Sequence, residues 1–416
     1  MMNRFFLTVV TAAMAWNFAA ASDKTLRLDY IFTGGCSTSV SIALSRMSVT
    51  DGWYGRSVNM DSLPVEGNGD IRVVDSRSGK TVYANSFSTL FQEWLNTDES
   101  KRVVRAFENT FLVPMPSAPA TVTLRLFDSH RNTVCEYSHP LDPEDILIAR
   151  KSVSEVDRRY IHKAGDPVQC IDVAIIAEGY TAAEMDLFYS DARAAVDAIL
   201  SHEPFGSHKG DFNFLAVAPV SALSGVSVPR DGIWRQTPVS SNFDTFYIQR
   251  YLTTDHVFDL HDILSGLPYE HIIILANTDV YGGGGIYNSY TLTTAHHPKF
   301  LPVVVHEFGH SFGALADEYD YDSYDDPYYF PTVEPWEQNI TTKFDFASKW
   351  KDMIDARVPG VGLHEGAGYQ SKGVWRACPD CRMRTNDAAG FCPVCQRAIE
   401  RMISFSTYEL SSSPRG

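Results

Sequence analysis

The chain contains 416 residues, of which 44% are hydrophobic and 21% charged, and its formal net charge is −16. This length is sufficient for two domains of ordinary size, and the apolar content is that of a globular protein and not of a disordered one. The negative charge and the lack of a long Lys/Arg run argue against a nucleic-acid partner, because phosphate backbones would be repelled.

The first segment, residues 1–21, has the layout of a cleaved secretory signal peptide. Arg4 precedes an apolar run that begins at Phe5, and alanines close the segment at positions 19–21. No later stretch reaches the roughly 18 apolar residues that a membrane span requires. We therefore expect an exported protein, secreted or periplasmic, that is cut near Ala21. An uncleaved anchor is the alternative reading of this segment.

Residues 22–150 have the pattern of an N-terminal β-sandwich domain. Short runs of alternating apolar and polar residues are separated by turn residues, which predicts half-exposed antiparallel strands. A short helix is expected at 88–98, and the polar segment 157–169 predicts a linker or a domain boundary. The strand-like runs lie at 25–35, 71–87, 110–117 and 121–130.

Residues 151–416 have the rhythm of an α/β domain. Apolar runs typical of buried strands alternate with helical patterns, which predicts strands and helices packed in layers. Thr181 is placed to cap the first helix, with Glu184 three residues later as its capping-box partner. The strand-like runs lie at 170–180, 211–220 and 271–277.

The segment VVVHEFGHSFGALADEY, Val303–Tyr319, carries the most specific chemistry of the chain. His306 and His310 are four residues apart, so on a helix both imidazoles reach one ion at about 2.0–2.1 Å, the usual zinc–nitrogen distance. Pro302 suits the first turn of such a helix. Glu307 is rotated by about 100° from His306. That is the position of a general base for a metal-activated water.

A catalytic zinc needs a third protein ligand and one open position. Gly313 can take the left-handed conformation that ends the helix and turns the chain back. Two acids follow, Asp317 and Glu318, and each can bind zinc through oxygen. The longer reach favours Glu318 as the third ligand, with Asp317 as the alternative.

The stretch HEFGHSFGALADEY resembles the extended zinc signature of the metzincins and, within that clan, of the IgA-peptidase (M64) family of metallopeptidases. Most metzincins have a histidine where this chain has Ala316, and the acids that follow match the IgA-peptidase pattern instead. The resemblance covers roughly residues 168–404, and the region before it is similar to the sandwich that precedes the peptidase domain in this family. It implies an α+β metzincin-like zinc peptidase domain, with a mixed sheet and an active-site helix, over residues 151–416.

The resemblance also assigns two further segments. Metzincins carry a methionine in a tight turn below the metal, and Met383 in CRMRT suits that role. The glycine run Gly283, Gly284, Gly285 lets another backbone approach closely, and the resemblance implies that an edge strand binds extended substrate there. A flexible hairpin loop is the alternative for these glycines.

Four of the seven cysteines form two CxxC pairs, Cys378/Cys381 and Cys392/Cys395. Such pairs are typical of a structural zinc site, but the oxidising compartment of an exported protein favours disulfides, and we expect disulfides. The acidic segment 317–329 reads as a solvated loop. Calcium is a weaker alternative there, because the regular spacing of a calcium loop is missing.

These features predict an exported zinc endopeptidase that hydrolyses peptide bonds of a protein or peptide substrate, with Glu307 as general base. One alternative is an exported adhesin or binding protein with a structural zinc site. The other is a zinc amidase that acts on cell-wall or glycan amide bonds. Glu307 speaks against the adhesin, since a purely structural site needs no base.

Overall fold

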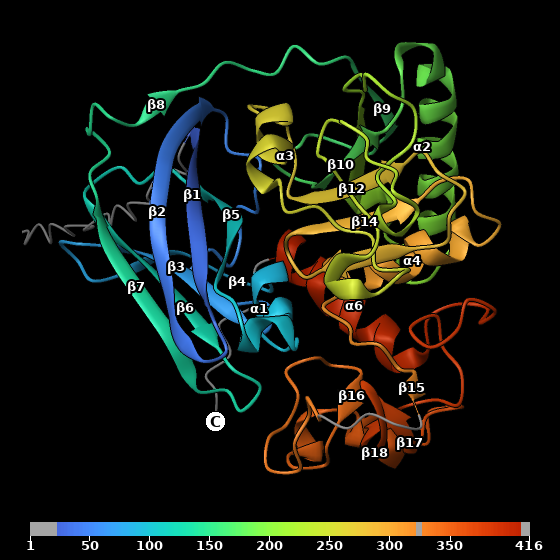
Figure 1. Cartoon of the computed structure of the whole chain (residues 1–416). Helices are drawn as coiled ribbons and strands as arrows, with labels where there is room; N and C mark the ends of the chain where they lie inside the picture. The colour runs from blue at the N-terminus through green and yellow to red at the C-terminus, as the bar shows by residue number, and fades with distance from the viewer. Residues whose placement is uncertain (1–22, 322–326, 409–416) are drawn as a thin grey trace, which may run out of the picture.

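The computed structural model of the chain describes residues 23–321 and 327–408. The expected signal peptide and residues 322–326 of the acidic segment lie outside the described residues. Figure 1 shows the N-terminal strands on one side, a larger sheet with helices on the other, and a small sheet below the larger one. Within the described ranges, no helix is both long and apolar enough to cross a membrane.

The N-terminal part forms two four-stranded sheets, ordered β5-β1-β2-β8 and β4-β3-β6-β7. Buried and half-exposed residues alternate strictly along β6. Because successive side chains of a strand point to opposite faces, one face of this sheet packs against a core. Buried residues of both sheets belong to the same apolar cluster. The elements are β1 (Lys24–Gly35), β2 (Thr38–Asp51), β3 (Gly69–Asp75), β4 (Thr81–Phe87), α1 (Leu90–Trp94), β5 (Arg105–Pro114), β6 (Ala120–Phe127), β7 (Thr133–Leu141) and β8 (Ala149–Arg150).

The larger sheet has the order β13-β14-β12-β10-β11-β9 and is mixed. Its inner strands pair in parallel, while β9 and β13 are antiparallel edges. The interpretation of 157–169 as a linker is therefore wrong for β9, which is polar because an edge strand leaves much of its surface to solvent. The strands are β9 (Arg158–Lys163), β10 (Ile171–Glu178), β11 (Phe212–Val217), β12 (His271–Ala276), β13 (Gly283–Ile286) and β14 (Tyr290–Thr294).

Both faces of the larger sheet are covered, which explains the unbroken apolar runs of its strands. Ala174 and Ile176 of β10 join the cluster that includes the N-terminal sheets, whereas Val173 and Ile175 join the cluster that includes residues of α2, α4 and α6. The predicted capping box at Thr181 and Glu184 is present just before α2. The helices are α2 (Met185–Leu200), α3 (Val257–Ile263), α4 (Phe300–Ser311), α5 (Lys351–Asp355) and α6 (Pro393–Thr407).

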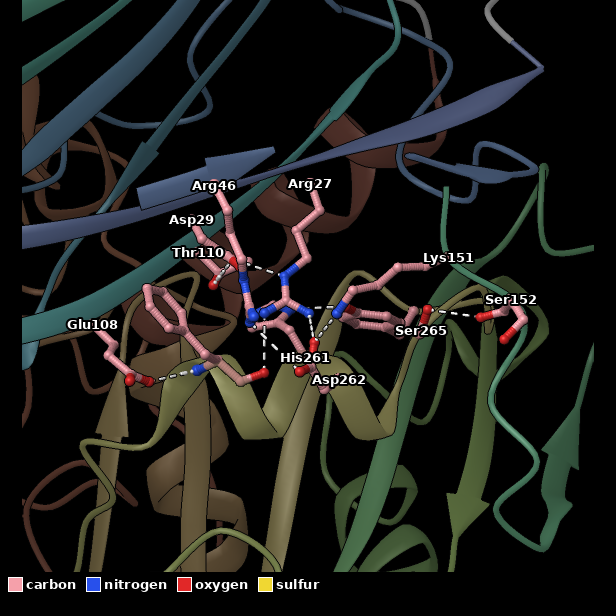
Figure 2. Close-up of polar contacts among 12 residues, drawn as sticks. Arg27, Asp29, Arg46, Glu108, Thr110, Lys151, Ser152, His261, Asp262 and Ser265 are labelled. Atoms are coloured by element: carbon pink, nitrogen blue, oxygen red, sulfur yellow. Dashed lines mark hydrogen bonds and ion pairs between the residues drawn. The ribbon is translucent and has the colours of Figure 1, made fainter. Parts of the chain in front are cut away.

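A charged cluster joins the N-terminal part to α3 (Figure 2). We call it the interdomain clasp, and it consists of Arg27, Asp29, Arg46, Lys151 and Asp262. Arg27 donates to Asp29 at 2.7 Å and also to Asp262, which is 235 residues away. Arg46 donates to the other oxygen of Asp29 at 2.5 Å, and Lys151 donates to Asp262. The two parts of the chain are thus joined by charge as well as by apolar packing.

A small sheet lies beyond the end of α4 (Figure 1). In this sheet β18 pairs with β15 in parallel and with β16 and β17 in antiparallel. The pairing of β15 with β18 places Tyr369 opposite Asp320, close to the acids that follow the metal helix. The strands are β15 (Asp320–Tyr321), β16 (Ile340–Thr341), β17 (His364–Ala367) and β18 (Tyr369–Arg376).

Candidate metal centre

The predicted metal helix is α4, and its apolar side chains anchor it. Val304, Val305 and Phe308 are fully buried, so the remaining face of the helix carries the two histidines. The rings of His306 and His310 lie 4.7 Å apart between centroids, and their Nε2 atoms are 3.1 Å apart. Two zinc-bound nitrogens in a tetrahedral site are separated by about 3.3 Å, given bonds of about 2.0–2.1 Å. The observed spacing fits one shared ion.

Backbone carbonyls fix the tautomer of both rings. Nδ1 of His306 lies 2.9 Å from the carbonyl oxygen of Arg382, and Nδ1 of His310 lies 2.6 Å from that of Leu315. A carbonyl oxygen only accepts, so each Nδ1 carries the proton and each Nε2 offers a lone pair. Both rings are thereby oriented as metal ligands before any ion arrives.

Asp317 supplies the third electron-rich atom. Its Oδ1 lies 3.0 Å from Nε2 of His306 and 3.2 Å from Nε2 of His310. This buried oxygen has no hydrogen-bond donor. Two ring nitrogens and an anionic oxygen at these distances need a cation between them, which is a proton in the metal-free site, and the three residues fit a bound divalent metal ion.

The same proximity shapes the pKa values of the metal-free site. Burial opposes charge on His310, but the Asp317 carboxylate outweighs it and raises the pKa of that imidazole to about 9. Burial alone would raise the pKa of the Asp317 carboxyl. The two histidines outweigh burial and hold that pKa well below its ordinary value. Burial raises the pKa of Glu307. The site is thus built to hold opposite charges together.

The preferred third ligand, Glu318, does not face the histidines, and Asp317 does. Glu318 is fully buried on the other side of the chain, where its Oε1 accepts from Cys395 Sγ and from Asn339 Nδ2, each at 3.0 Å. The length of the acidic side chain therefore does not decide which acid faces the histidines. The two neighbouring side chains leave the backbone in different directions, so the path of the chain decides which acid meets the imidazoles.

The turn after α4 also differs from the prediction. The left-handed residue is Ala314, with φ 55°, and not Gly313. A Cβ at position 313 would lie 2.7 Å from the carbonyl oxygen of Gly309, so glycine is required there for close packing. The reversal at Ala314 brings Asp317 back to the histidines.

Met383 packs against the metal helix. It is fully buried, and a Cβ on Gly309 would lie only 2.7 Å from its sulfur. Its carbonyl accepts from the backbone N–H of Glu318 at 2.8 Å. The preceding carbonyl, of Arg382, is the one that orients His306. This turn therefore holds the metal helix and the segment of acids together.

The glycine run forms β13, which lies directly beside Glu307. A Cβ on Gly283 would lie 2.8 Å from Oε1 of Glu307, and one on Gly285 would lie 2.3 Å from the backbone oxygen of the same residue. Because these positions have no side chain, helix α4 and the carboxylate of Glu307 can lie directly against the strand. Gly283 is not a free substrate edge, because its N–H donates to Arg250 at 3.2 Å and its carbonyl accepts from Leu252 at 3.4 Å.

No motif marks two further neighbours of the site. Tyr369 donates its hydroxyl to Oδ2 of Asp317 and so fixes the carboxylate. Tyr251, whose ring lies 2.8 Å from where a Gly284 Cβ would be, donates to Glu93 of α1. Burial raises the pKa of Glu93 to about 7 although the Tyr251 hydrogen bond acts in the opposite direction. Helix α1 therefore brings the N-terminal part close to the candidate centre.

The cysteine region is also different from expectation. All seven cysteines are free thiols, and the disulfides expected among the CxxC pairs are not formed. The sulfurs of Cys381 and Cys395 lie 3.7 Å apart, well beyond the disulfide bond length of about 2.05 Å.

Two imidazoles and a carboxylate that fit one ion, with a glutamate beside them, form an arrangement that can activate water for hydrolysis. The family profile described as IgA Peptidase M64 matches residues 160–360 and 355–403, and the one described as Peptidase M64 N-terminus matches residues 17–138. The first profile spans more than half of the 416 residues, and the chain belongs to the M64 family of IgA-peptidase-like metallopeptidases. A search among curated proteins found no match.

Proposed function

We propose that this M64 metallopeptidase is an exported zinc endopeptidase of the metzincin type, which cleaves protein or peptide substrates. One observation carries the metal assignment: Nε2 of His306, Nε2 of His310 and Oδ1 of Asp317 converge within 3.0–3.2 Å of one another. Zinc takes such ligands in tetrahedral geometry and keeps its fourth position for chemistry.

Two features support the metzincin type. Met383 lies beneath α4, and an antiparallel strand, β13, forms the edge of the mixed sheet beside Glu307. Export rests on the sequence pattern of residues 1–21 alone. A protein substrate is what the family implies, and no residue of the site singles out a particular one.

Residues of the chain itself can carry out the proton transfers of the reaction. Zinc in this position supplies Lewis acidity toward a carbonyl oxygen and toward water. Glu307 lies beside the metal ligands and against Gly283, and burial raises its pKa, which makes it a stronger base than a solvated glutamate. It accepts the proton of the attacking water and returns it to the leaving amine. Asp317 offsets part of the metal charge, which makes this base more necessary.

The test is Glu307→Gln, which keeps the shape of the side chain and removes the base. We expect zinc content to stay at the wild-type level while turnover of a quenched fluorescent peptide library falls by about 10²–10⁴-fold or more. Glu66→Gln, at an exposed glutamate, is the matched control and should change neither quantity. Retained cleavage by Glu307→Gln would show that this glutamate is not the base.

A further inference from the structure

A second set of metal-type side chains lies behind the candidate centre. Cys381 follows β18, Cys392 caps α6, and Cys395 lies in the first turn of that helix. Glu318, the acid that does not reach the histidines, points into the same place. Exposure is 1% for Cys381, 6% for Cys392 and 0% for both Cys395 and Glu318. One ligand atom from each lies within 4.8 Å of all the others.

The sulfur spacing is that of thiolates around an ion. Four ligands at zinc–sulfur distances of about 2.3 Å, arranged tetrahedrally, are separated from one another by about 3.8 Å. Sγ of Cys381 lies 3.7 Å from Sγ of Cys395. Sγ of Cys381 also accepts from the backbone N–H of Cys392 at 3.2 Å, which stabilises negative charge on that sulfur.

One oxygen of the Glu318 carboxylate has no hydrogen-bond partner among the described residues. Its Oε1 lies 3.0 Å from Cys395 Sγ and 3.0 Å from Asn339 Nδ2, but its Oε2 is buried and has no hydrogen-bond donor. A buried carboxylate oxygen without a partner is unfavourable for the folded state. A cation among the sulfurs would supply that partner.

The charge around the cluster favours an anionic metal complex. Arg376 and Arg382 are buried and close to it, with exposures of 8% and 5%. Arg376 donates to the carbonyl oxygen of Cys378 at 3.1 Å, and Arg382 donates to that of Ala388 at 2.7 Å and lies 3.3 Å from Nε2 of His202. In residues 23–321 and 327–408 neither guanidinium forms an ion pair. Two buried cations without carboxylates offset the net charge of three thiolates and a carboxylate on one divalent ion.

Cys378 lies at the edge of this set and hydrogen-bonds with the sulfur of Cys392. Its thiol also donates to the carbonyl oxygen of Gly360 at 3.1 Å, and it is not among the four residues whose ligand atoms all lie within 4.8 Å of one another. It is therefore the competing candidate for the fourth ligand position.

We propose that Cys381, Cys392, Cys395 and Glu318 bind a second, structural metal ion, and that the ion is a thiolate-preferring one such as zinc. A closed site of three sulfurs and one oxygen leaves no open position, so it does no chemistry of its own. It ties the chain at two points that serve the first centre. Cys381 precedes Arg382, whose carbonyl orients His306, and Glu318 follows Asp317.

Metal counting on the full chain, purified without chelator, tests the second site. Wild type should hold two zinc ions per chain, and the double variant His306→Ala/His310→Ala should hold one. Cobalt in the double variant should give the intense thiolate-to-cobalt absorption that nitrogen and oxygen ligands cannot produce. A double variant without metal would overturn the second site and leave the proposed peptidase centre intact. Equal metal content in wild type and the double variant would do the reverse.

Single changes made within the double variant test the ligand set. Cys395→Ser and Glu318→Gln should each weaken zinc binding by at least about tenfold in competition with a chromophoric chelator. Cys36→Ser, at an exposed cysteine, is the control and should bind zinc as tightly as the parent, and Cys378→Ser should bind zinc more tightly than Glu318→Gln does. Loss of zinc in Cys378→Ser with retention in Glu318→Gln would overturn this assignment.

Unmutated protein provides a readout that does not depend on variant folding. Alkylation of the wild-type chain in denaturant and chelator, without reductant, should modify all seven cysteines. A mass-spectrometric disulfide between any two of Cys381, Cys392 and Cys395 would overturn the second site.

Discussion

Tyr369 donates its hydroxyl to Oδ2 of Asp317, the oxygen that faces away from the two imidazoles. The two residues are 52 positions apart, and the parallel pairing of β15 with β18 brings them together. Each oxygen of the carboxylate therefore has its own task. Oδ1 faces the metal position, and Oδ2 is held by the tyrosine so that the carboxylate cannot rotate.

Removing that hydroxyl should loosen the metal. We expect Tyr369→Phe to weaken zinc binding by about 10–100-fold, the usual cost of losing an outer partner of a ligand. The measurement is competition with a chromophoric chelator, read alongside peptidase activity at saturating zinc. Tyr247→Phe, at a tyrosine that is 82% exposed, is the control. Unchanged zinc affinity in Tyr369→Phe would mean that Asp317 is positioned by its backbone alone.

Substitutions of the two neighbouring acids, Asp317 and Glu318, should have different effects on the histidine-bound zinc. Asp317→Asn removes the third ligand, and we expect zinc at the histidines to be bound at least about 100-fold more weakly, with loss of peptidase activity. Glu318→Gln should leave the histidine-bound zinc in place, because its carboxylate faces Cys395 and Asn339. Peptidase activity of both variants, measured at the same free zinc concentration, decides between the acids, because each variant is expected to weaken one of the two zinc sites. The opposite pattern would restore Glu318 as the ligand.

Gly285 should tolerate no side chain. A Cβ there would lie 2.3 Å from the backbone oxygen of Glu307 and 2.9 Å from Cβ of His310, and neither neighbour is the end of a flexible side chain. We expect Gly285→Ala to lower the free energy of unfolding by about 2 kcal/mol or more, as forced overpacking does. Gly210→Ala is the matched control, since nothing lies within 4 Å of its Cβ position. Urea denaturation of both variants measures the difference.

Asp29 should contribute to stability in a pH-dependent way. Burial opposes its charge, but hydrogen bonds and charge from Arg27, with help from Thr110 and Arg46, lower the pKa of this carboxyl below its ordinary value of 3.8. A lowered folded-state pKa gives stability that is complete above the unfolded pKa and is lost as pH falls through the folded value.

The variant Asp29→Asn measures that contribution. At pH 7 it removes one of the two anions that the buried Arg27 contacts and leaves Asp262 as the other, so we expect a cost of about 1–3 kcal/mol. The gap to wild type should stay constant from pH 7 to about 5 and narrow below about pH 4, where the wild-type carboxyl also becomes neutral. Asp98→Asn, at an exposed residue, should follow the wild-type profile. A gap that does not change with pH would show that Asp29 acts through packing.

Local patterns predicted much of this molecule and long-range geometry decided the rest. Helix α4, its histidines and the capping box at Thr181 depend on neighbours within a turn, so spacing alone located them. The choice between Asp317 and Glu318 depends on how the chain returns after Ala314, which no local pattern encodes.

Two other misses have the same origin. Residues of β9 look like a linker because their burial partner, β11, is about 50 positions away. Cys381 and Cys395 could be paired or separate on composition alone, and only the packing of α6 against the turn at Met383 sets their distance. Tyr369 has no sequence signal because its role depends entirely on the pairing of β15 with β18.

The interdomain clasp also sets an order of assembly. A ribosome releases Arg27, Asp29 and Arg46 early, but their partner Asp262 emerges more than 200 residues later. Until α3 is present, Arg27 lacks one of its two carboxylate partners. Because α4 follows α3 in the chain, the platform formed by the early sheets and α3 can close before the histidine-bearing helix is synthesised. The residues of the clasp thus all precede the histidine-bearing helix in the chain, whereas Asp317, Met383 and α6 follow that helix.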